Sequence, residues 1–169
     1  MSTDPEFTNK IVGLLREWKI KGLPSRGGLM VTADDLLRWR EDAGISGLWP
    51  HPPLMATATI DDGFGQGLAI IHKFAEAVGL SVHPIGLMLE PDVIIDVCRS
   101  LRPAILGLTV LQFDSEETIA YIAGHLPAET KIIAGGPVFS ADPEFADRAG
   151  VHSVAAHAGD FLEYLVNDF

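Results

Sequence analysis

The sequence is poor in cysteine and contains no long apolar run. Its single cysteine, Cys98, cannot form an internal disulfide, and no second cysteine or cysteine/histidine cluster accompanies it to build a zinc site. We therefore expect Cys98 to be a small buried apolar residue. No apolar run approaches the ~20 residues needed to cross a bilayer, and the polar residues 1–9 lack the apolar stretch of a secretory signal. These absences predict a soluble, cytoplasmic protein without membrane contact.

Basic residues are also scarce. The formal net charge is −11, from 12 basic and 23 acidic residues. Residues 1–53 hold seven of each sign, which leaves five basic and 16 acidic residues for the rest of the chain. Because contact with phosphates needs clustered Lys and Arg, this balance argues against nucleic-acid binding by the second part. An acidic surface favours solubility and also suits a basic partner protein.

What the chain does have is ample apolar content, 47% of its 169 residues, in a regular alternation. From Leu54 onward, short apolar runs alternate with amphipathic ones, which is typical of a parallel sheet with crossover helices. We predict an α/β, flavodoxin-like (Rossmann-like) sheet of five parallel strands in the order 2-1-3-4-5. The predicted strands are residues 54–60, 81–86, 104–110, 130–135 and 152–156. The predicted helices are residues 66–78, 91–101, 115–125, 142–149 and 159–167.

The N-terminal third of the sequence differs in character. We predict that residues 1–53 form a helical extension and connector, and that residues 54–169 form the α/β unit. Apolar residues recur at helical spacing over residues 6–20, which predicts a first amphipathic helix. Residues 32–42 are predicted to be a second helix, with Thr32 as its N-cap. A homodimer through this two-helix extension is one expected assembly.

A glycine-rich loop joins the first predicted strand to its helix. In Asp61-Asp62-Gly63-Phe64-Gly65-Gln66-Gly67, three glycines fall within five residues, so the backbone is able to approach a bound group closely. The start of the following helix offers free N–H donors to a polar ligand. In doubly wound sheets, ligands bind over the carboxyl ends of the strands, near the switch between the first and third strands. The sequence therefore predicts a ligand site at this loop.

Three motifs at predicted strand ends resemble those of the cobalamin (corrinoid)-binding domain family. Asp62-x-Phe64-x-x-Gly67 resembles the family's Asp-x-His-x-x-Gly loop, with Phe64 at the position of the cobalt-ligating His. Thr109-Val110-Leu111 resembles the Ser-x-Leu after the third strand, and Gly135-Gly136-Pro137 resembles the Gly-Gly after the fourth. The resemblance covers roughly residues 56–166. The cofactor-binding residues that it implies are Asp62, Gly63, Phe64, Gly65, Gly67, Thr109, Leu111, Gly135, Gly136 and Pro137.

The resemblance also implies a function. In the family, the nucleotide tail of cobalamin enters a slot between the sheet and the first and last helices, and a hydroxyl at the end of the third strand, here Thr109, hydrogen-bonds the base. Phe64 cannot ligate a metal, so the resemblance implies a His-off cobalamin, which we expect to be base-off, the alternative being that cobalt keeps its own base; loss of a strong axial donor makes the cobalt easier to reduce. No nucleophile–base pair is visible. The chain is therefore predicted to be a carrier or cofactor subunit for methyl or electron transfer by a partner enzyme or activator protein.

Alternatives remain open from the residues alone. One is a corrinoid-free or haem-binding sensor or interaction module on the same fold, in which His51 or His157 approaches the ligand as an axial group. The tryptophans at positions 18, 39 and 49 either cover the corrin face or form a small core between helices and sheet. Asp62 either faces a ligand or caps the following helix.

Overall fold

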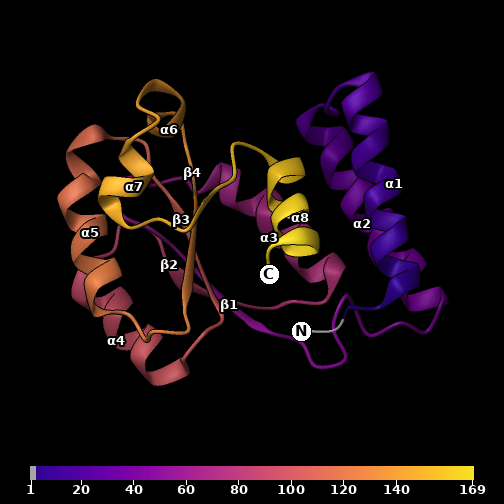
Figure 1. Ribbon diagram of the computed structural model, residues 1–169, viewed down its shortest axis with the longest axis horizontal. Helices are drawn as coiled ribbons and strands as arrows, with labels where there is room; N and C mark the ends of the chain where they lie inside the picture. Colours follow the sequence, from indigo (N-terminus) through magenta and orange to yellow (C-terminus); the bar gives the residue numbers. More distant parts are fainter. Residues whose placement is uncertain (1–2) are drawn as a thin grey trace.

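The computed structural model describes residues 3–169, which form one parallel sheet with helices on both faces (Figure 1). The strand order is β2-β1-β3-β4-β5 and every pairing is parallel, so the predicted fold class and order are confirmed. The strands are β1 (Leu54–Thr59), β2 (Ser81–Gly86), β3 (Ile105–Thr109), β4 (Lys131–Gly135) and β5 (Ser153–Val154). The helices are α1 (Pro5–Lys21), α2 (Arg26–Asp42), α3 (Gln66–Val78), α4 (Pro91–Leu101), η1 (Phe113–Ser115, a 3-10 turn), α5 (Glu116–His125), α6 (Val138–Ala141), α7 (Phe145–Ala149) and α8 (Ala158–Asn167).

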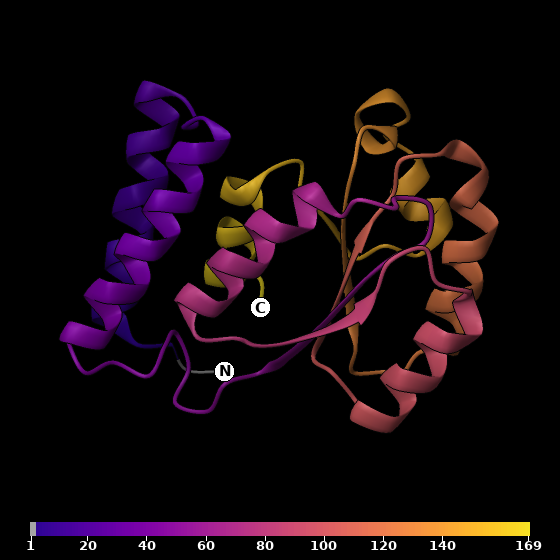
Figure 2. The same ribbon diagram turned by 180° about the vertical axis from the view of Figure 1, so that it is seen from behind.

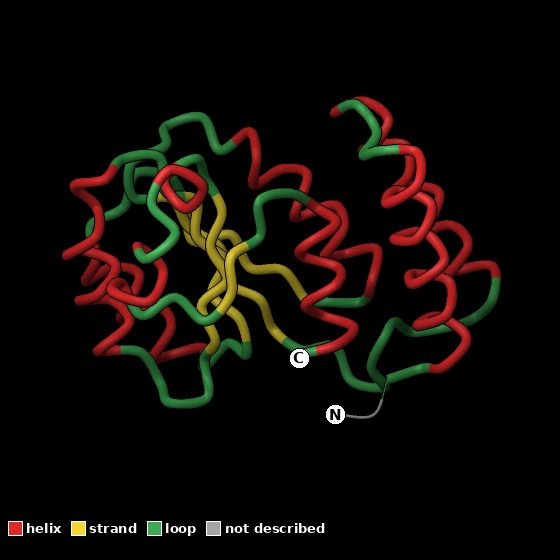
Figure 3. Tube along the Cα trace, turned by 45° about the horizontal axis from the view of Figure 1, so that its top comes forward, coloured by secondary structure: helices red, strands yellow, loops and turns green. Residues whose placement is uncertain are grey.

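The helices form layers around the sheet. Helices α3 and α8 cover one face, while α4, α5 and α7 cover the other (Figure 2). The predicted N-terminal helix pair is present, with α2 packed on α3 and α1 packed on α8 as a further layer. Figure 3 shows the strands, in yellow, between red helices on either side. Each face of the sheet therefore has its own buried core, as expected for an all-parallel sheet.

Local signals explain why α3, β2 and α4 begin and end where the sequence predicted. Gly79 adopts a left-handed conformation (φ +95°), and its N–H donates to the Ala75 carbonyl, which ends α3. The buried stripe of α3 includes Leu68, Ala75 and Val78, at successive spacings of seven and three residues. Pro91 is the first residue of α4, where its missing N–H removes no helical hydrogen bond.

The predicted start of α2 is wrong. The helix begins at Arg26, because Ser25 is its N-cap and accepts a hydrogen bond from the Gly28 N–H through Oγ (3.2 Å). Thr32 lies inside the helix, and its hydroxyl donates to the Gly28 carbonyl (2.8 Å). Two glycines in the first turn lower the helix propensity, which is why the sequence pattern favoured a loop. Tertiary packing overrides that preference, since Leu29 is only 5% exposed.

The C-terminal half also departs from the predicted boundaries. A 3-10 turn precedes α5, and Ser115, the N-cap residue of α5, makes no side-chain hydrogen bond to the helix. The helix predicted over residues 142–149 begins only at Phe145, as α7, and the short helix α6 precedes it where no helix was predicted, with Asp142 in an extended conformation between the two. The last strand has only two residues, Ser153–Val154, and pairs with β4 at the edge of the sheet.

The tryptophans pack in the core, and none of them lines the cavity that opens at the carboxyl edge of the sheet. Trp18 is 8% exposed and its ring meets Phe74 of α3 edge-on, with 5.8 Å between centroids. Trp49 is 1% exposed and meets Phe169 edge-on at 5.3 Å. Trp39 stacks on another ring of the N-terminal helix pair at 5.7 Å. The packing alternative for these residues is therefore confirmed, and the N-terminal helices join the core on the α3/α8 face.

Two predictions drawn from what the sequence lacks are testable in the structure. Cys98 is fully buried, and burial raises the pKa of its thiol to about 11, so the thiol is neutral and unreactive near pH 7. Across residues 3–169, no helix combines the length and apolar composition that crossing a membrane requires. The prediction for Cys98 is confirmed.

Candidate functional site

A cavity of about 530 Å³ opens at the carboxyl edge of the sheet, between the sheet and helices α3 and α8. Strands β1, β3 and β4 form one wall, α3 and α8 form the opposite wall, and the loop after β5 closes one end. Leu29 of α2 completes the lining. Small-molecule sites typically measure about 300 to 1,000 Å³ and are mostly apolar with a few polar groups. This cavity fits that description, since Asp62 and His157 are the ionisable side chains among its lining residues.

The β1–α3 loop shapes the open end of the cavity. Asp62 is only 9% exposed, and its Oδ1 accepts a hydrogen bond from the Phe64 N–H (2.9 Å). This bond closes a turn two residues before the helix, whose N-cap is Gly65 in a left-handed conformation (φ +61°). Asp62 therefore stabilises the loop and does not cap α3. The Phe64 ring, which lines the cavity, is 85% exposed and lies at its mouth.

Two threonines of β1 fix the surroundings of the cavity, Thr57 through helix α3 and Thr59 through the β1–α3 loop. The Thr57 hydroxyl is hydrogen-bonded to His72 Nε2 of α3 (2.6 Å), and burial lowers the pKa of His72 against a smaller opposing effect of Glu76. The Thr59 hydroxyl donates to the Asp62 carbonyl and accepts from the Met88 N–H. Both hydroxyls are thus engaged within the protein, so the loop is fixed to the strand beneath it.

Small residues on β3 and β4 form the inner wall. A Cβ at Gly107 would meet Met55 Cε at 2.7 Å, and a Cβ at Gly135 would meet the Ala155 carbonyl oxygen at 2.6 Å. Gly136 has φ +132°, and a Cβ there would lie 1.8 Å from the Val110 carbonyl oxygen. The hydroxyl-bearing Thr109 lines the same wall. The wall therefore leaves a slot that larger side chains would fill.

A carboxylate outside the cavity ties its loops together. Asp61 follows β1, and its side chain accepts hydrogen bonds from the Leu111 N–H (3.0 Å), the Gln112 N–H (3.0 Å) and the Ser115 hydroxyl (2.7 Å). The loop after β1 and the loop after β3 are therefore joined at the cavity rim. Sequence reasoning placed Asp61 in the glycine-rich loop but did not identify this role.

We expect Asp61→Ala to lower the free energy of unfolding by about 2 kcal/mol, because it removes a charged acceptor from three donors at a partly buried position. Urea unfolding followed by circular dichroism measures the change. Asp114→Ala makes the same substitution at an exposed position in the adjacent η1 turn and serves as the control. Equal unfolding midpoints for the two variants would contradict the anchoring role.

The histidines predicted to approach a ligand are separated by the fold. His157 lines the cavity, and its Nδ1 accepts hydrogen bonds from the N–H groups of Gly159 (3.1 Å) and Asp160 (3.3 Å), which caps α8. His51 precedes β1 and therefore lies at the amino edge, so its predicted place at the functional edge is wrong. Within the described residues, no group of three or more His, Cys, Asp or Glu side chains gathers to hold a metal ion.

The structure brings most of the predicted site residues to one place. The predicted residues that line the cavity are Asp62, Phe64, Gly67, Thr109, Leu111, Gly135 and Gly136. Gly63, Gly65 and Pro137 lie in the same loops but outside the lining. A Cβ at Gly65 would meet Leu87 Cδ2 at 2.8 Å, and one at Gly63 would meet Met88 Sδ at 2.9 Å. These two glycines therefore allow the loop after β2 to pack against the β1–α3 loop.

Sequence reasoning missed several lining residues. Gly107 lies in the interior of an apolar strand, which is a signal of close approach by another group. Ala155 and Ala156 follow the shortest strand, where the sequence offers only their small size. Leu29 lies 25 residues before the predicted α/β unit begins at Leu54, and no local pattern places it at the cavity.

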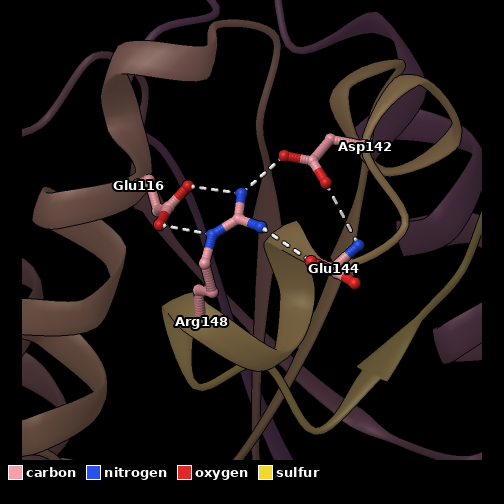
Figure 4. Close-up of polar contacts among 4 residues, drawn as sticks. All are labelled: Glu116, Asp142, Glu144 and Arg148. Atoms are coloured by element: carbon pink, nitrogen blue, oxygen red, sulfur yellow. Dashed lines mark hydrogen bonds and ion pairs between the residues drawn. The ribbon is translucent and has the colours of Figure 1, made fainter.

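An ion cluster braces the loops at the far side of the rim (Figure 4). Arg148 of α7 donates from Nε and Nη2 to both carboxylate oxygens of Glu116 at the start of α5 (2.9 Å each). Nη2 also reaches Asp142, which follows α6 (2.5 Å), and Nη1 lies 3.8 Å from Glu144. Hydrogen bonds from Arg148 lower the pKa of both Glu116 and Asp142, and these carboxylates raise the pKa of the guanidinium. The cluster joins α5, α6 and α7.

We expect Arg148→Gln to reduce stability at neutral pH and to lose this effect in acid. The lowered carboxyl pKa values stabilise the folded state at pH values above the ordinary carboxyl range, and this contribution is lost as the pH falls through the lowered values. The difference in unfolding free energy between wild type and variant should therefore shrink below about pH 4. Urea unfolding at several pH values tests this, with Arg16→Gln as a control for loss of an exposed positive charge. A difference independent of pH would contradict it.

Comparison with known proteins gives a consistent result. Residues 55–166 match the family described as B12 binding domain. No match is found among curated proteins. A cobalamin-binding protein from Desulfitobacterium hafniense superposes with a TM-score of 0.76 at 20% identity, covering 94% of this chain and 78% of that one.

Two further solved structures share the fold. The methanol:cobalamin methyltransferase complex MtaBC from Methanosarcina barkeri gives a TM-score of 0.67 at 15% identity, covering 96% of this chain and 66% of that one. The monomethylamine corrinoid protein of the same organism gives a TM-score of 0.62 at 12% identity, covering 97% of each chain. At these identities the structural matches establish the fold, and the match over residues 55–166 establishes the family.

Proposed function

This chain belongs to the B12 binding domain family, and on that premise we propose that it binds a corrinoid whose nucleotide tail occupies the cavity beside β3 and β4. The observation that carries the proposal is the slot of about 530 Å³ at the carboxyl edge of the sheet. It is lined by Thr109, Gly135 and Gly136, the residues at which the sequence resembles the family.

The residues present fit such a tail. Gly107, Gly135 and Gly136 line the inner wall without side chains of their own, and a Cβ at any of them would collide with protein atoms. A Cβ at Gly67, on the opposite wall, would meet no atom within 4 Å, so open space lies beside this turn of α3. Thr109 brings a hydroxyl to an otherwise largely apolar wall, where it is suited to hydrogen-bond the base of the tail.

Phe64 distinguishes this chain from relatives that use a histidine ligand. Its ring lies at the mouth of the cavity, carries no lone pair for a metal and leaves Asp62 without an imidazole to orient. We propose that the corrinoid is held base-off and His-off. When bound, the corrinoid supplies methyl-transfer or electron-transfer chemistry at cobalt, while the chain binds and orients it.

We further propose that the chain works as a carrier or cofactor subunit for a partner enzyme or activator protein. MtaBC is a methyltransferase complex, which is the kind of assembly that such a carrier would join. The chain's acidic surface, with a net charge of −11, would favour a partner with a basic docking face. A homodimer through α1 and α2 is the other assembly that the proposal allows.

The test is a titration of the protein with hydroxocobalamin and with methylcobalamin, read by gel filtration and visible absorption. Co-elution with a base-off spectrum would support the proposal, and the elution volume would report whether α1 and α2 mediate a dimer. Co-elution with an unchanged base-on spectrum would reject tail insertion into the cavity. Failure to bind either form, with haem tested in parallel, would favour the corrinoid-free or haem-binding sensor or interaction module.

A further inference from the structure

The first turn of α2 reaches the mouth of the cavity, although it lies far from the cavity in sequence. Arg26 Nη2 donates a hydrogen bond to the carbonyl oxygen of Gln66, the first residue of α3 (2.9 Å). Gln66 lines the cavity, and so does Leu29, three residues beyond Arg26. The guanidinium of Arg26 is exposed, and its hydrogen bond holds it beside Gln66, a residue of the lining to which Arg26 itself does not belong.

Arg26 is also free of carboxylate partners. Some nearby cations form ion pairs with acidic side chains, as in Lys73 with Asp34 (2.8 Å), Arg38 with Asp35 (3.3 Å) and Lys19 with Glu163 (2.9 Å), whereas Arg16 and Arg40, like Arg26, have none within 4.0 Å among the described residues. Among the described residues, no carboxylate lies within 4.0 Å of the Arg26 guanidinium. A guanidinium has five N–H donors in a planar fork that matches phosphate, and the bond to Gln66 uses one nitrogen.

A corrinoid with a nucleotide tail brings one anionic group to this place. Its tail contains a phosphodiester between the nucleoside and the corrin ring. When the nucleoside is inserted in the cavity, the phosphodiester therefore lies towards the mouth. The acidic side chain in the cavity lining is Asp62, and the chain carries a net charge of −11. A phosphate at this opening is therefore repelled unless a cation compensates it.

Resting on the proposed function, we infer that Arg26 binds the phosphodiester of the nucleotide tail and makes the protein selective for corrinoids that carry one. The hydrogen bond to Gln66 orients the guanidinium, and the remaining N–H groups face the phosphate oxygens. The N-terminal helix pair thus contributes a specificity residue to a cavity formed mainly by residues 55–161.

The test compares cobalamin with cobinamide, a corrinoid that lacks the phosphate and the nucleoside. Arg26→Gln removes the charge, and Arg26→Lys keeps the charge but loses the planar fork of N–H donors. Arg16→Gln is the control, because it removes an exposed arginine of α1 that does not line the cavity. We expect Arg26→Gln to raise the Kd for cobalamin roughly 5- to 10-fold, with a smaller effect for Arg26→Lys. Cobinamide affinity should be unchanged in all three variants. Salt should weaken cobalamin binding more in wild type than in Arg26→Gln.

Each outcome bears on the inference. Selective loss of cobalamin affinity in Arg26→Gln, with a flatter salt dependence and an unaffected Arg16→Gln, would support it. Equal losses for cobalamin and cobinamide would overturn it and assign Arg26 a purely structural role through Gln66. Unchanged cobalamin affinity in Arg26→Gln would overturn it while leaving the proposed function intact. Failure of the wild-type protein to bind either corrinoid would reject the proposed function and the inference together.

Discussion

Thr109→Trp is expected to abolish corrinoid binding, raising the Kd for hydroxocobalamin and methylcobalamin by at least roughly 100-fold. Thr109 lies at the end of β3 on the inner wall of the cavity, next to the positions where Gly135 and Gly136 keep the slot open. An indole placed there occupies the space proposed for the base of the tail. Because Thr109 is half-buried at a cavity and not in the packed core, the fold has room to accept the larger ring.

Three control variants separate blockage from other causes. Phe113→Trp adds an indole on η1, at a 56% exposed position outside the cavity lining, and should bind like wild type. Thr109→Ser keeps the hydroxyl and should retain affinity, while Thr109→Val removes it and should weaken binding roughly 5-fold. Circular dichroism and thermal unfolding confirm that each variant is folded. Wild-type affinity in folded Thr109→Trp would show that the tail does not enter this slot.

Phe64→His is expected to convert a base-off, His-off corrinoid complex into a His-on complex, with affinity increased on the order of 10-fold. Residue 64 lies at the cavity mouth in a loop fixed to β1 by the hydroxyl of Thr59. Asp62 Oδ1 already accepts the N–H of residue 64 at 2.9 Å, so the carboxylate lies close to the base of the new side chain. A carboxylate beside an imidazole fixes its tautomer and increases its basicity as a ligand.

Visible absorption of the purified complex reads the change in axial ligation directly. Phe64→Gln places a polar side chain without an imidazole at the same position and should leave the spectrum base-off. Adding Asp62→Asn to Phe64→His should weaken the new cobalt–imidazole bond while leaving the slot unchanged. A base-off spectrum in Phe64→His would mean that residue 64 does not face cobalt and that the loop holds the corrin in another orientation.

The candidate site was predictable as far as it depends on short segments at strand ends. The motifs at Asp62, Thr109 and Gly135 each lie directly at or after a strand, and parallel strands bring their carboxyl ends to one edge. Their meeting at one cavity therefore follows from the strand order. The misplacement of His51 could have been avoided by the same reasoning, since a residue that directly precedes a strand lies at the amino edge of the sheet.

The sequence by itself determined the order and type of the α/β elements, the bounds of α3, β2 and α4, and the cluster of glycines at the carboxyl edge. Residues within a few positions of one another set these features, through apolar periodicity, a glycine C-cap and a proline at a helix start. Such signals act over one or two turns of chain and so can be read locally.

Only the tertiary structure decided which distant segments complete the cavity. Packing of α2 on α3 extends α2 to Arg26 despite two glycines, and it brings Leu29 to the wall. The crossover between β4 and β5 contains two short helices, α6 and α7, and Arg148 joins both of them to α5. The burial of the tryptophans likewise depends on rings far away in the chain. These features arise from contacts between separate elements, whose free energy no local pattern encodes.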